Sequence, residues 1–467
     1  IIETRKFTVT EVARMFNVPP HKLKDLERST FCLTGETEVY SEDGPKPIKD
    51  VTVGESVWSL TDDGAWKLSR VTASGCTGTD EILCIKTTNR TVRANAKHPI
   101  LVRRKSPAPR SGIGGYQSVA WKNEWVKAGE LQVGDTIVEA EALPDLGQRK
   151  APNGRELNEG FMAFCGLLLG DGNLTKSNGR HIGVGIARAW GAPYMDFYRD
   201  VMRKEFVKNR DGSRGTYLRR KSAPISLQEG ARYTRFNSVS AGQELSILGL
   251  SGIARTKQVP SWVFWASEDL RLAFLGGFLD ADGSVDKKGR TSFSSCNPRM
   301  LSQMRHLCMG LGIPVTNLRL QRGVTTLPNG ERKEFAQYNF TCSDPGANRR
   351  IGTHTPEYIK RWNAGKPFNR KERNYPRYGG KNFKSDGLSL ARISSITSEA
   401  PQPVYDLTVE GTHCFIADGI VVHNSNVEHQ AIEYVVDAIR PRCVRWEQRL
   451  MSSLLSPQDR ANGIFIE

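Results

Sequence analysis

A ten-residue pattern that occurs twice in the first third of the chain is the feature that most constrains its fold. Residues 48–57 (IKDVTVGESV) resemble residues 128–137 (AGELQVGDTI). Both copies lie between Cys32 and about Leu143, where short runs of strand-forming residues are separated by Gly and Asp turn residues. The pair therefore predicts an all-β domain with internal pseudo-symmetry.

Two stretches far apart in the chain combine strand-like composition with reactive side chains. One runs from Cys32 to Tyr40 (CLTGETEVY), and the other from Val404 to Ser425 (VYDLTVEGTHCFIADGIVVHNS). A thiol at Cys32 is suited to attack the preceding carbonyl and convert an amide into a thioester. The closing His-Asn-Ser supplies a proton donor, an amide that can attack its own backbone carbonyl, and a hydroxyl that accepts an acyl group. The structural alternative for a lone cysteine is a small buried apolar residue.

Together, these stretches resemble the opening and closing blocks of an intein, a segment that excises itself and joins its flanks. The resemblance implies the all-β Hint (Hedgehog/intein) fold and splicing without a cofactor. It implies that Cys32 is the first nucleophile, that Asn424 cyclises with help from His423, and that Ser425 accepts the acyl group. Residues 32–424 would then leave the chain.

Four further positions match intein blocks. The stretch VRANAKHPIL contains Asn95 and His98, where the family places the groups that activate the first amide. The family usually has Thr at the position of Asn95, and we expect the Asn to donate a hydrogen bond to a developing oxyanion. By the same resemblance Asp406 couples the first two steps and His413 assists cyclisation. The structural alternatives are a buried histidine for His98, a turn carboxylate for Asp406 and a strand-end side chain for His413.

Residues 151–345 differ in character, because apolar helix-like segments appear and one pattern recurs. FCGLLLGDG places Asp171 before Gly172, and LGGFLDADG places Asp282 before Gly283. Each copy indicates an apolar helix that closes on an acid-Gly turn. Since glycine lets two helices approach backbone to backbone, we expect the two acids to lie side by side. Adjacent carboxylates repel unless a cation lies between them, and Mg²⁺ prefers oxygen ligands.

This pair resembles the double-motif LAGLIDADG homing endonucleases. The resemblance implies Mg²⁺-dependent cleavage of double-stranded DNA, with Asp171 and Asp282 as metal ligands. Lys257, in the stretch TKQVP, matches the family's lysine block and would stabilise charge in the active site. The first copy departs from the family pattern at Leu169, where an Asp is usual. A core helix that closes on an Asp-Gly turn is the structural alternative for each copy.

The charge is unevenly distributed. The formal net charge is +16, and nearly all of the excess lies between residues 32 and 424. A basic domain of this kind usually meets a polyanion, with a merely solvated surface as the alternative. We expect residues 203–235, rich in Arg, Lys and Tyr, to supply strands that lie on DNA, and residues 346–390 to form an irregular basic connector. No apolar run reaches membrane-spanning length, so no membrane partner is expected.

The two flanks, residues 1–31 and 425–467, each indicate short helices. Joined, they contain Phe7-Thr8-Val9, Val18-Pro19-Pro20-His21 and Arg445-Trp446-Glu447. With these stretches they resemble the portal protein of tailed double-stranded-DNA phages, which forms a homo-oligomeric ring at a capsid vertex. The resemblance implies splicing in the cytoplasm of a bacterial host, with the spliced product in the virion. A helix-turn-helix over Val12–Leu26 is the alternative. Because the chain does not begin with Met, we expect it to be a fragment of a longer host protein.

We therefore expect a multidomain protein. An all-β Hint splicing domain, formed by residues 32–150 and 391–424, would be interrupted by an α/β (α+β) LAGLIDADG endonuclease domain at 151–345 and by the connector. Short helical fragments of the host would flank it. A hypothesis from another class is a DNA-binding structural or regulatory protein whose Hint-like module no longer reacts. The two hypotheses differ in whether the purified chain shortens itself.

Overall fold

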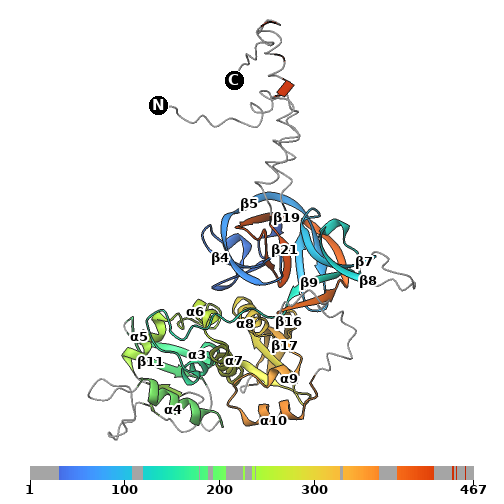
Figure 1. Ribbon diagram of the computed structural model, residues 1–467. Helices are drawn as coiled ribbons and strands as arrows, with labels where there is room; N and C mark the ends of the chain where they lie inside the picture. Colours follow the sequence, from blue (N-terminus) through green and yellow to red (C-terminus); the bar gives the residue numbers. More distant parts are fainter. Residues whose placement is uncertain are drawn as a thin grey trace.

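The computed structural model describes two units that are packed against each other (Figure 1). The residues described are 31–107, 119–177, 179–187, 193–206, 225–226, 234–236, 238–326, 330–367, 387–424, 444–445, 449 and 458. One unit consists almost entirely of strands, and the other combines helices with two smaller sheets. None of the helices in these ranges has the length and apolar character that crossing a bilayer requires. The predicted helices of the flanks lie outside the described residues, as does Ser425.

The strand-rich unit is built from both ends of the central region. Its elements are β1 (Leu33–Thr34), β2 (Glu38–Ser41), β3 (Gly44–Pro47), the 3₁₀ helix η1 (Ile48–Asp50), β4 (Ser56–Leu60), β5 (Trp66–Lys86), β6 (Thr91–Ala94), β7 (Pro99–Pro107), β8 (Val119–Lys127), the 3₁₀ helix η2 (Ala128–Glu130), β9 (Thr136–Ala140), β18 (Leu388–Arg392), β19 (Ser395–Val409), β20 (Cys414–Ala417) and β21 (Ile420–His423). Among the described residues these strands form one sheet, in the order β18-β9-β7-β21-β20-β2-β4-β5-β19-β1-β6, with β3 on β2 and β8 on β7. Buried Val, Ile and Leu side chains from most of the strands form its core. The all-β prediction for this part is confirmed.

The two copies of the sequence repeat form equivalent structures. Each begins with a 3₁₀ helix, η1 or η2, and continues into a strand, β4 or β9. The glycines of the two copies, Gly54 and Gly134, have left-handed φ values of 97° and 98°, which favour glycine. The N–H of Gly54 donates to the carbonyl of Val71 at 2.8 Å, and that of Gly134 donates to the carbonyl of Ile393 at 2.9 Å. The predicted pseudo-symmetry therefore extends to backbone hydrogen bonds.

The pseudo-symmetry also locates the second unit. β4 pairs with the start of β5 as a hairpin, and the N–H of Thr61 donates to the carbonyl of Ala65 across its turn at 2.9 Å. β9 pairs in the same way with β18, and the N–H of Glu141 donates to the carbonyl of Gly387 at 2.8 Å. The second unit therefore occupies the place of a hairpin turn, and its two chain ends are held together by a backbone hydrogen bond.

The second unit repeats one arrangement of helix and sheet. Its elements are α3 (Glu159–Asp171), β10 (Gly172–Ser177), β11 (Arg180–Ile186), α4 (Met195–Phe206), β12 (Ile225–Ser226), β13 (Thr234–Phe236), α5 (Val239–Ile247), α6 (Ser261–Trp265), α7 (Glu268–Asp282), β14 (Gly283–Val285), β15 (Thr291–Ser295), α8 (Pro298–Gly310), β16 (Arg319–Thr326), β17 (Arg332–Cys342), α9 (Pro345–Asn348) and α10 (Pro356–Ala364). The described strands form two four-stranded sheets, β10-β11-β13-β12 and β14-β15-β17-β16. In Figure 1, α3 and α7 lie side by side between the two sheets. The predicted helix pair is thus the centre of this unit.

The glycines of α3 and α7 allow this close approach. A Cβ atom on Gly166 would lie 2.0 Å from the carbonyl oxygen of Phe274, and one on Gly277 would lie 1.8 Å from that of Ala163. Real Cβ atoms do not approach a backbone oxygen so closely, so any side chain at either position would force the helices apart. The backbone contact predicted from the two motifs is therefore present on both sides of the helix pair.

Gly277→Ala is expected to destabilise the second unit by about 3 kcal/mol or more, because the added methyl overlaps backbone that cannot move aside cheaply. Chemical denaturation of the whole chain, followed by far-UV circular dichroism, measures the loss. Gly310→Ala is the matched control: it is also a helix glycine, but its nearest atoms lie 3.9 Å from the added Cβ. This change should be neutral or stabilising by up to about 1 kcal/mol. Equal stability of the two variants would show that α3 and α7 are not in backbone contact.

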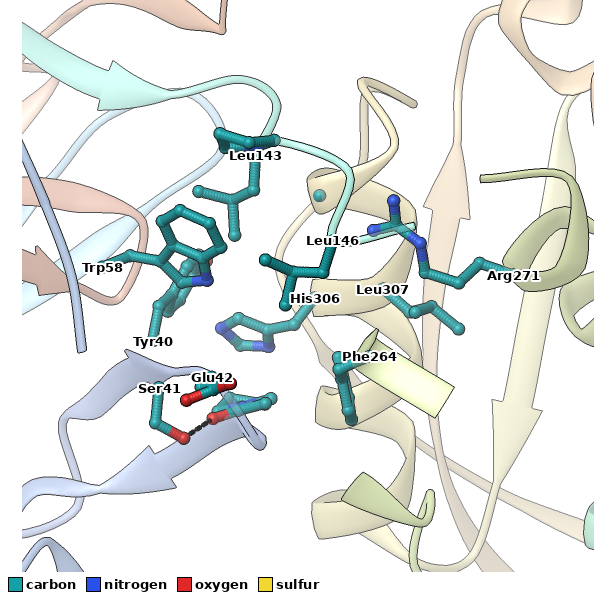
Figure 2. Close-up of a pocket in the computed structure, with 14 residues that line it drawn as sticks. Tyr40, Ser41, Glu42, Trp58, Leu143, Leu146, Phe264, Arg271, His306 and Leu307 are labelled. Carbon is teal, nitrogen blue, oxygen red and sulfur yellow. Dashed lines mark hydrogen bonds between the residues drawn. The ribbon is translucent and has the colours of Figure 1, made fainter. Parts of the chain in front are cut away.

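The two units share a buried contact, in which α8 packs against the strand-rich unit. Figure 2 shows Tyr40 and Trp58 of that unit facing His306 of α8. The ring centroids of Tyr40 and His306 are 4.4 Å apart in an edge-on arrangement. The hydroxyl of Ser302 donates to the carboxylate of Glu38 at 2.6 Å, and burial raises the pKa of that carboxyl. The packing of the second unit is therefore linked to β2, a few residues after Cys32.

Part of the chain expected to be an irregular connector is folded. Residues 346–390 include α10 and most of α9. The indole N–H of Trp362 in α10 donates to the hydroxyl of Thr291 at 2.9 Å. These helices pack on the second unit, because Trp362 is 2% exposed within its apolar core. The prediction of an irregular segment was wrong there because it gave more weight to Gly, Pro and charge than to this anchoring tryptophan. Strand structure resumes at Leu388, and residues 368–386 lie outside the described ranges.

Candidate functional site

The strand that follows Cys32 is held between two others. Leu33 pairs with Tyr405 of β19 on one side and with Ala94 of β6 on the other. The N–H of Asn95 donates to the carbonyl of Cys32 at 3.0 Å. Cys32 itself is 1% exposed. Strand pairing and this hydrogen bond therefore hold the backbone around Cys32 in place.

The side chain of Asn95 contacts the amide that joins Phe31 to Cys32. Its Oδ1 accepts a hydrogen bond from the N–H of Cys32 at 3.2 Å, and its Nδ2 donates to the carboxylate of Asp80 at 3.1 Å. Asp80 thereby fixes the orientation of the Asn95 amide. We expected Asn95 to donate to an oxyanion, whereas in this geometry its oxygen accepts the hydrogen of the amide between Phe31 and Cys32.

His98 lies beside the same amide. The ring is fully buried, and burial lowers its pKa to about 3, an effect that the backbone of Phe31 opposes and the nearby His423 reinforces. The imidazole is therefore neutral at neutral pH. Because its folded-state pKa is below the unfolded value of 6.5, this group costs stability as the pH falls from about 6.5 toward 3. A neutral ring beside the Phe31 backbone is able to give or take one proton there.

At the other end, β20 and β21 present His423 and Asn424. Nδ1 of His423 lies 2.5 Å from the carbonyl oxygen of Asn424, so this nitrogen carries the proton and donates it. The N–H of Asn424 donates to the carbonyl of His413 at 3.0 Å. Its side-chain amide is fully buried, and in the orientation that satisfies both ends its oxygen accepts from the N–H of Val409 at 2.7 Å while its nitrogen donates to His413. Trp125 lies edge-on to His423, with ring centroids 4.9 Å apart.

The two ends of the central region meet at Phe31. Its ring centroid lies 6.4 Å from that of His98 and 6.0 Å from that of His423, edge-on to both. Strand pairing explains the encounter, because Val422 of β21 pairs with Ile100 of β7 and so brings the residues that flank both strands together. The thiol of Cys32, the imidazoles of His98 and His423, and the amide of Asn424 thus share one end of the sheet.

A family model described as an intein splicing domain matches residues 117–424 of the chain. The chain belongs to the intein splicing domain family. It is a self-splicing intein, and the strand-rich unit is its Hint-like splicing domain. The match ends at Asn424, the residue that directly follows β21.

The intein is similar to curated proteins whose names differ from one another. An iron–sulfur cluster assembly SufBD family protein of Mycobacterium leprae is 26% identical over 84% of this chain and 44% of its own length. A replicative DNA helicase DnaB of Rhodothermus marinus is 25% identical over 90% of this chain and 48% of its own. The alpha subunit of a ribonucleoside-diphosphate reductase of Bacillus subtilis is 21% identical over 87% and 37%. The chain spans less than half the length of each of these relatives.

Solved structures similar to the intein include two splicing domains. The Ssp DnaB mini-intein variant M86 is 11% identical, with a TM-score of 0.28, over 85% of this chain and 94% of its own. A DnaB intein from Synechocystis sp. PCC 6803 is 10% identical, with a TM-score of 0.26, over 85% and 99%.

Other predicted splicing residues lie around this centre. Asp406 is largely buried on β19, next to the residue that pairs with Leu33, and one of its oxygens accepts from the N–H of Leu407 at 2.8 Å. His413 has a left-handed φ of 51° at the turn before β20. The sulfur of Cys32 lies 2.9 Å from the hydroxyl oxygen of Thr77. Sequence reasoning missed Thr77 and Asp80, since both are ordinary polar residues within a long strand.

In the second unit, the intein brings its two motif acids to corresponding places. Asp171 ends α3 and Asp282 ends α7, and each is followed by a glycine that starts a strand. A Cβ atom on Gly170 would lie 3.3 Å from Oδ2 of Asp282, so that carboxylate lies against the last turn of α3. The juxtaposition of the two helix ends follows directly from the glycine contact described above.

Lys257 lies near both acids, Asp171 and Asp282. Its ammonium group donates to the carbonyls of Leu168 at 2.8 Å, of Leu169 at 2.9 Å and of Gly172, at the C-terminal end of α3. Burial lowers the pKa of Lys257 to about 8, while the charges of Asp282 and Asp171 act in the opposite direction. Lys257 therefore caps a helix and also places a positive charge close to the acids.

The fit of a magnesium ion rests on these two carboxylates. Among the described residues, no group of three or more His, Cys, Asp or Glu side chains is arranged to hold a metal. Mg²⁺ is commonly bound through one or two protein carboxylates, with water and substrate phosphates completing its shell. Two half-buried acids at adjacent helix ends are consistent with that kind of site.

Proposed function

We propose that the intein excises residues 32–424 and joins Phe31 to Ser425. The thiol of Cys32 attacks the carbonyl of Phe31 to give a thioester, and the hydroxyl of Ser425 then takes over the acyl group. Cyclisation of Asn424 releases the intein, and an acyl shift leaves a normal peptide bond. The observation that carries the proposal is the Phe31 ring, which lies against His98 and His423 of the two junctions.

At the first junction, His98 and Asn95 activate the amide. Asn95 accepts the amide N–H and so fixes the plane of the bond that must break. The neutral His98 ring, beside the Phe31 backbone, is suited to deliver the proton that the departing nitrogen requires. Asp406, which follows the Tyr405 that pairs with Leu33, assists the transfer from the first to the second junction.

At the second junction, His423 polarises the carbonyl that Asn424 attacks. The contact between its Nδ1 and that oxygen is already 2.5 Å. His413 holds the Asn424 backbone and side chain through its carbonyl oxygen. The reaction needs no cofactor, because each step uses groups of the chain itself.

Replacing residues 142–386 by Asp-Asp-Gly, the sequence of residues 62–64, is expected to leave splicing intact. The replacement recreates on β9 and β18 the turn that joins β4 and β5. Because loop-closure entropy changes slowly with length, the splicing rate should stay within about tenfold of the parent. Intact mass spectrometry of the purified product measures it, with Asn424→Ala in the shortened chain as the inactive control. A soluble shortened chain that does not splice would show that the second unit is required.

For the second unit, we propose a homing endonuclease that cleaves double-stranded DNA. Asp171 and Asp282 would hold Mg²⁺, which supplies the charge that stabilises the displaced phosphate oxygen. Lys257 provides a further positive charge at the same place. The backbone contact of α3 and α7, with an acid at each helix end, supports this proposal.

For the host, we propose a phage portal protein whose ligated flanks join a homo-oligomeric ring. Splicing would take place in the cytoplasm of the bacterial host, and the spliced product would enter the virion. The resemblance of residues 1–31 and 425–467 to portal proteins supports this proposal. Electron microscopy of the complete spliced host protein tests it, since a portal forms rings and an unrelated host does not.

A purified chain that shortens itself distinguishes splicing from the alternative of a DNA-binding protein with an inactive Hint-like module. Mass spectrometry of the intact protein over time should show two products: residues 32–424, and residues 1–31 joined to 425–467. A mass that stays constant would favour the alternative.

A further inference from the structure

Thr77 occupies an irregular point in the pairing of two long strands. β5 and β19 run antiparallel, with Gly78 opposite Val404 and Cys76 opposite Tyr405, so Thr77 is an extra residue between two regular pairs. Such a β-bulge bends its strand and turns a side chain out of the regular alternation. The following Gly78 has a φ of 136°, a conformation that favours glycine. The bulge therefore determines where the Thr77 side chain is directed.

The hydroxyl of Thr77 is directed at the sulfur of Cys32. Oγ1 lies 2.9 Å from Sγ, and the same oxygen donates to the carbonyl of Val404 at 3.2 Å. A hydroxyl has one hydrogen and two lone pairs. Since its hydrogen points to Val404, the oxygen presents a lone pair to the sulfur, and the thiol donates its S–H. The three groups form a short chain from sulfur to hydroxyl to backbone carbonyl.

The two side chains differ in their contact with solvent. Cys32 is 1% exposed and packs with Ile82 and Val404, whereas Thr77 is exposed. A thiolate among apolar side chains is unfavourable unless a hydrogen-bond donor faces it. The buried thiol must also pass its proton to a group that reaches water. The Thr77 hydroxyl satisfies both requirements, because it contacts the sulfur and lies on an exposed residue.

We infer that Thr77 is a further catalytic residue of splicing, which takes the proton of the Cys32 thiol and then donates to the thiolate. As the thiol proton moves to Oγ1, the hydroxyl's own proton leaves the Val404 carbonyl and passes to solvent water. The proton received from the sulfur stays on Oγ1 and donates a hydrogen bond to the thiolate. The sulfur then bonds to the carbonyl carbon of Phe31 and the bond from that carbon to the nitrogen of Cys32 breaks. The nitrogen takes up one proton from solvent water by way of His98, which replaces the proton that left the thiol, so neither protons nor electrons change in number.

The inference rests on the proposed role of Cys32 as first nucleophile, and the test separates the two. The full chain carrying Asn424→Ala isolates the first step, because the intein cannot be released by cyclisation. Dithiothreitol then cleaves the thioester, and mass spectrometry follows the release of residues 1–31. The variants compared in this background are Thr77→Val, which keeps the shape without the hydroxyl, and Thr77→Ser, which keeps the hydroxyl.

Thr72→Val is the matched control. Thr72 is also exposed on β5, and its hydroxyl also donates to a carbonyl of β19, that of Thr408, at 3.3 Å. Unlike the hydroxyl of Thr77, it is not bonded to the sulfur of Cys32. We expect Thr77→Val to slow release by about 10- to 100-fold, the effect of losing a hydrogen bond to a charged group. Thr77→Ser keeps the hydroxyl, and Thr72→Val is a surface substitution away from the sulfur. Both variants should therefore release residues 1–31 within about threefold of the parent rate.

The inference is overturned if Thr77→Val releases residues 1–31 as fast as the parent while Cys32→Ala releases none. Release by Cys32→Ala would instead remove the proposed function itself. If circular dichroism shows that Thr77→Val does not fold, the release rates of Thr77→Ala and Thr77→Ser are compared instead. A hydroxyl requirement makes serine at least tenfold faster than alanine, and equal rates refute it.

Discussion

Cys32→Ala is expected to lower formation of the ligated product by more than about 10³-fold, because no other group replaces the lost nucleophile. The change removes a buried sulfur atom and its contact with Thr77, while the hydrogen bonds of the Cys32 backbone to Asn95 remain. The fold of the strand-rich unit should therefore survive. Intact mass spectrometry after incubation of the purified chain measures the loss.

Asn424→Ala is the matched change at the other junction. We expect the thioester and its ester successor to form, while residues 32–424 stay attached because no side chain amide is left to cyclise. Each variant should therefore accumulate a different species: Cys32→Ala gives slow release at the C-terminal junction, and Asn424→Ala gives thiol-sensitive cleavage after Phe31. A chain with both changes that still produced ligated flanks would contradict the assignment of both residues.

Asp282→Asn is expected to reduce DNA cleavage by more than about 10²-fold, since the change removes a charge from the proposed magnesium site. Splicing should proceed at the parent rate, because Asp282 lies in the second unit at the end of α7. Linearisation of a plasmid that carries the uninterrupted host site, with Mg²⁺ present, measures the cleavage. Unchanged cutting by the variant would remove Asp282 from the metal site.

The neighbouring acid of the same motif provides the control. Asp280 is buried, and its carboxylate accepts hydrogen bonds from the hydroxyls of Tyr198, Thr353 and Thr355 at 2.7, 2.5 and 2.6 Å. Asp280→Asn should therefore lower the thermal stability of the unit, whereas Asp282→Asn should leave it nearly unchanged. The two acids of one motif would then be separated into a structural and a metal-binding residue.

The sequence predicted the fold well where one pattern controls one element. The repeat at residues 48–57 and 128–137 predicted two like β structures, and the glycine-containing apolar segments predicted a helix pair in backbone contact. It failed at residues 346–367, where Gly, Pro and charged residues suggested an irregular chain. There the buried Trp362 anchors α10 to the second unit, and a single tertiary contact outweighs local composition.

Chemistry was sufficient to choose candidate site residues, but not to predict the hydrogen bonds between them. Cys32 and Asn424 could be chosen by chemistry, because few residue types perform those reactions. The direction of the Asn95 amide could not be predicted, since it depends on Asp80, which β5 brings to the end of β6. Thr77 reaches Cys32 only because of a β-bulge, and register shifts of that kind have no reliable signal in a strand sequence.

One measurement tests most directly whether a sulfur and an amide from opposite ends of the intein work as one centre. The purified chain is incubated, digested with trypsin and sequenced by tandem mass spectrometry. Joined flanks give a peptide that begins Ser-Thr-Phe-Ser-Asn-Val, in which Phe31 is bonded directly to Ser425. We expect that peptide to accumulate together with an excised species that ends in a succinimide. Its absence, with separate fragments ending at Phe31 and beginning at Ser425, would show that the two ends react independently and would contradict the account.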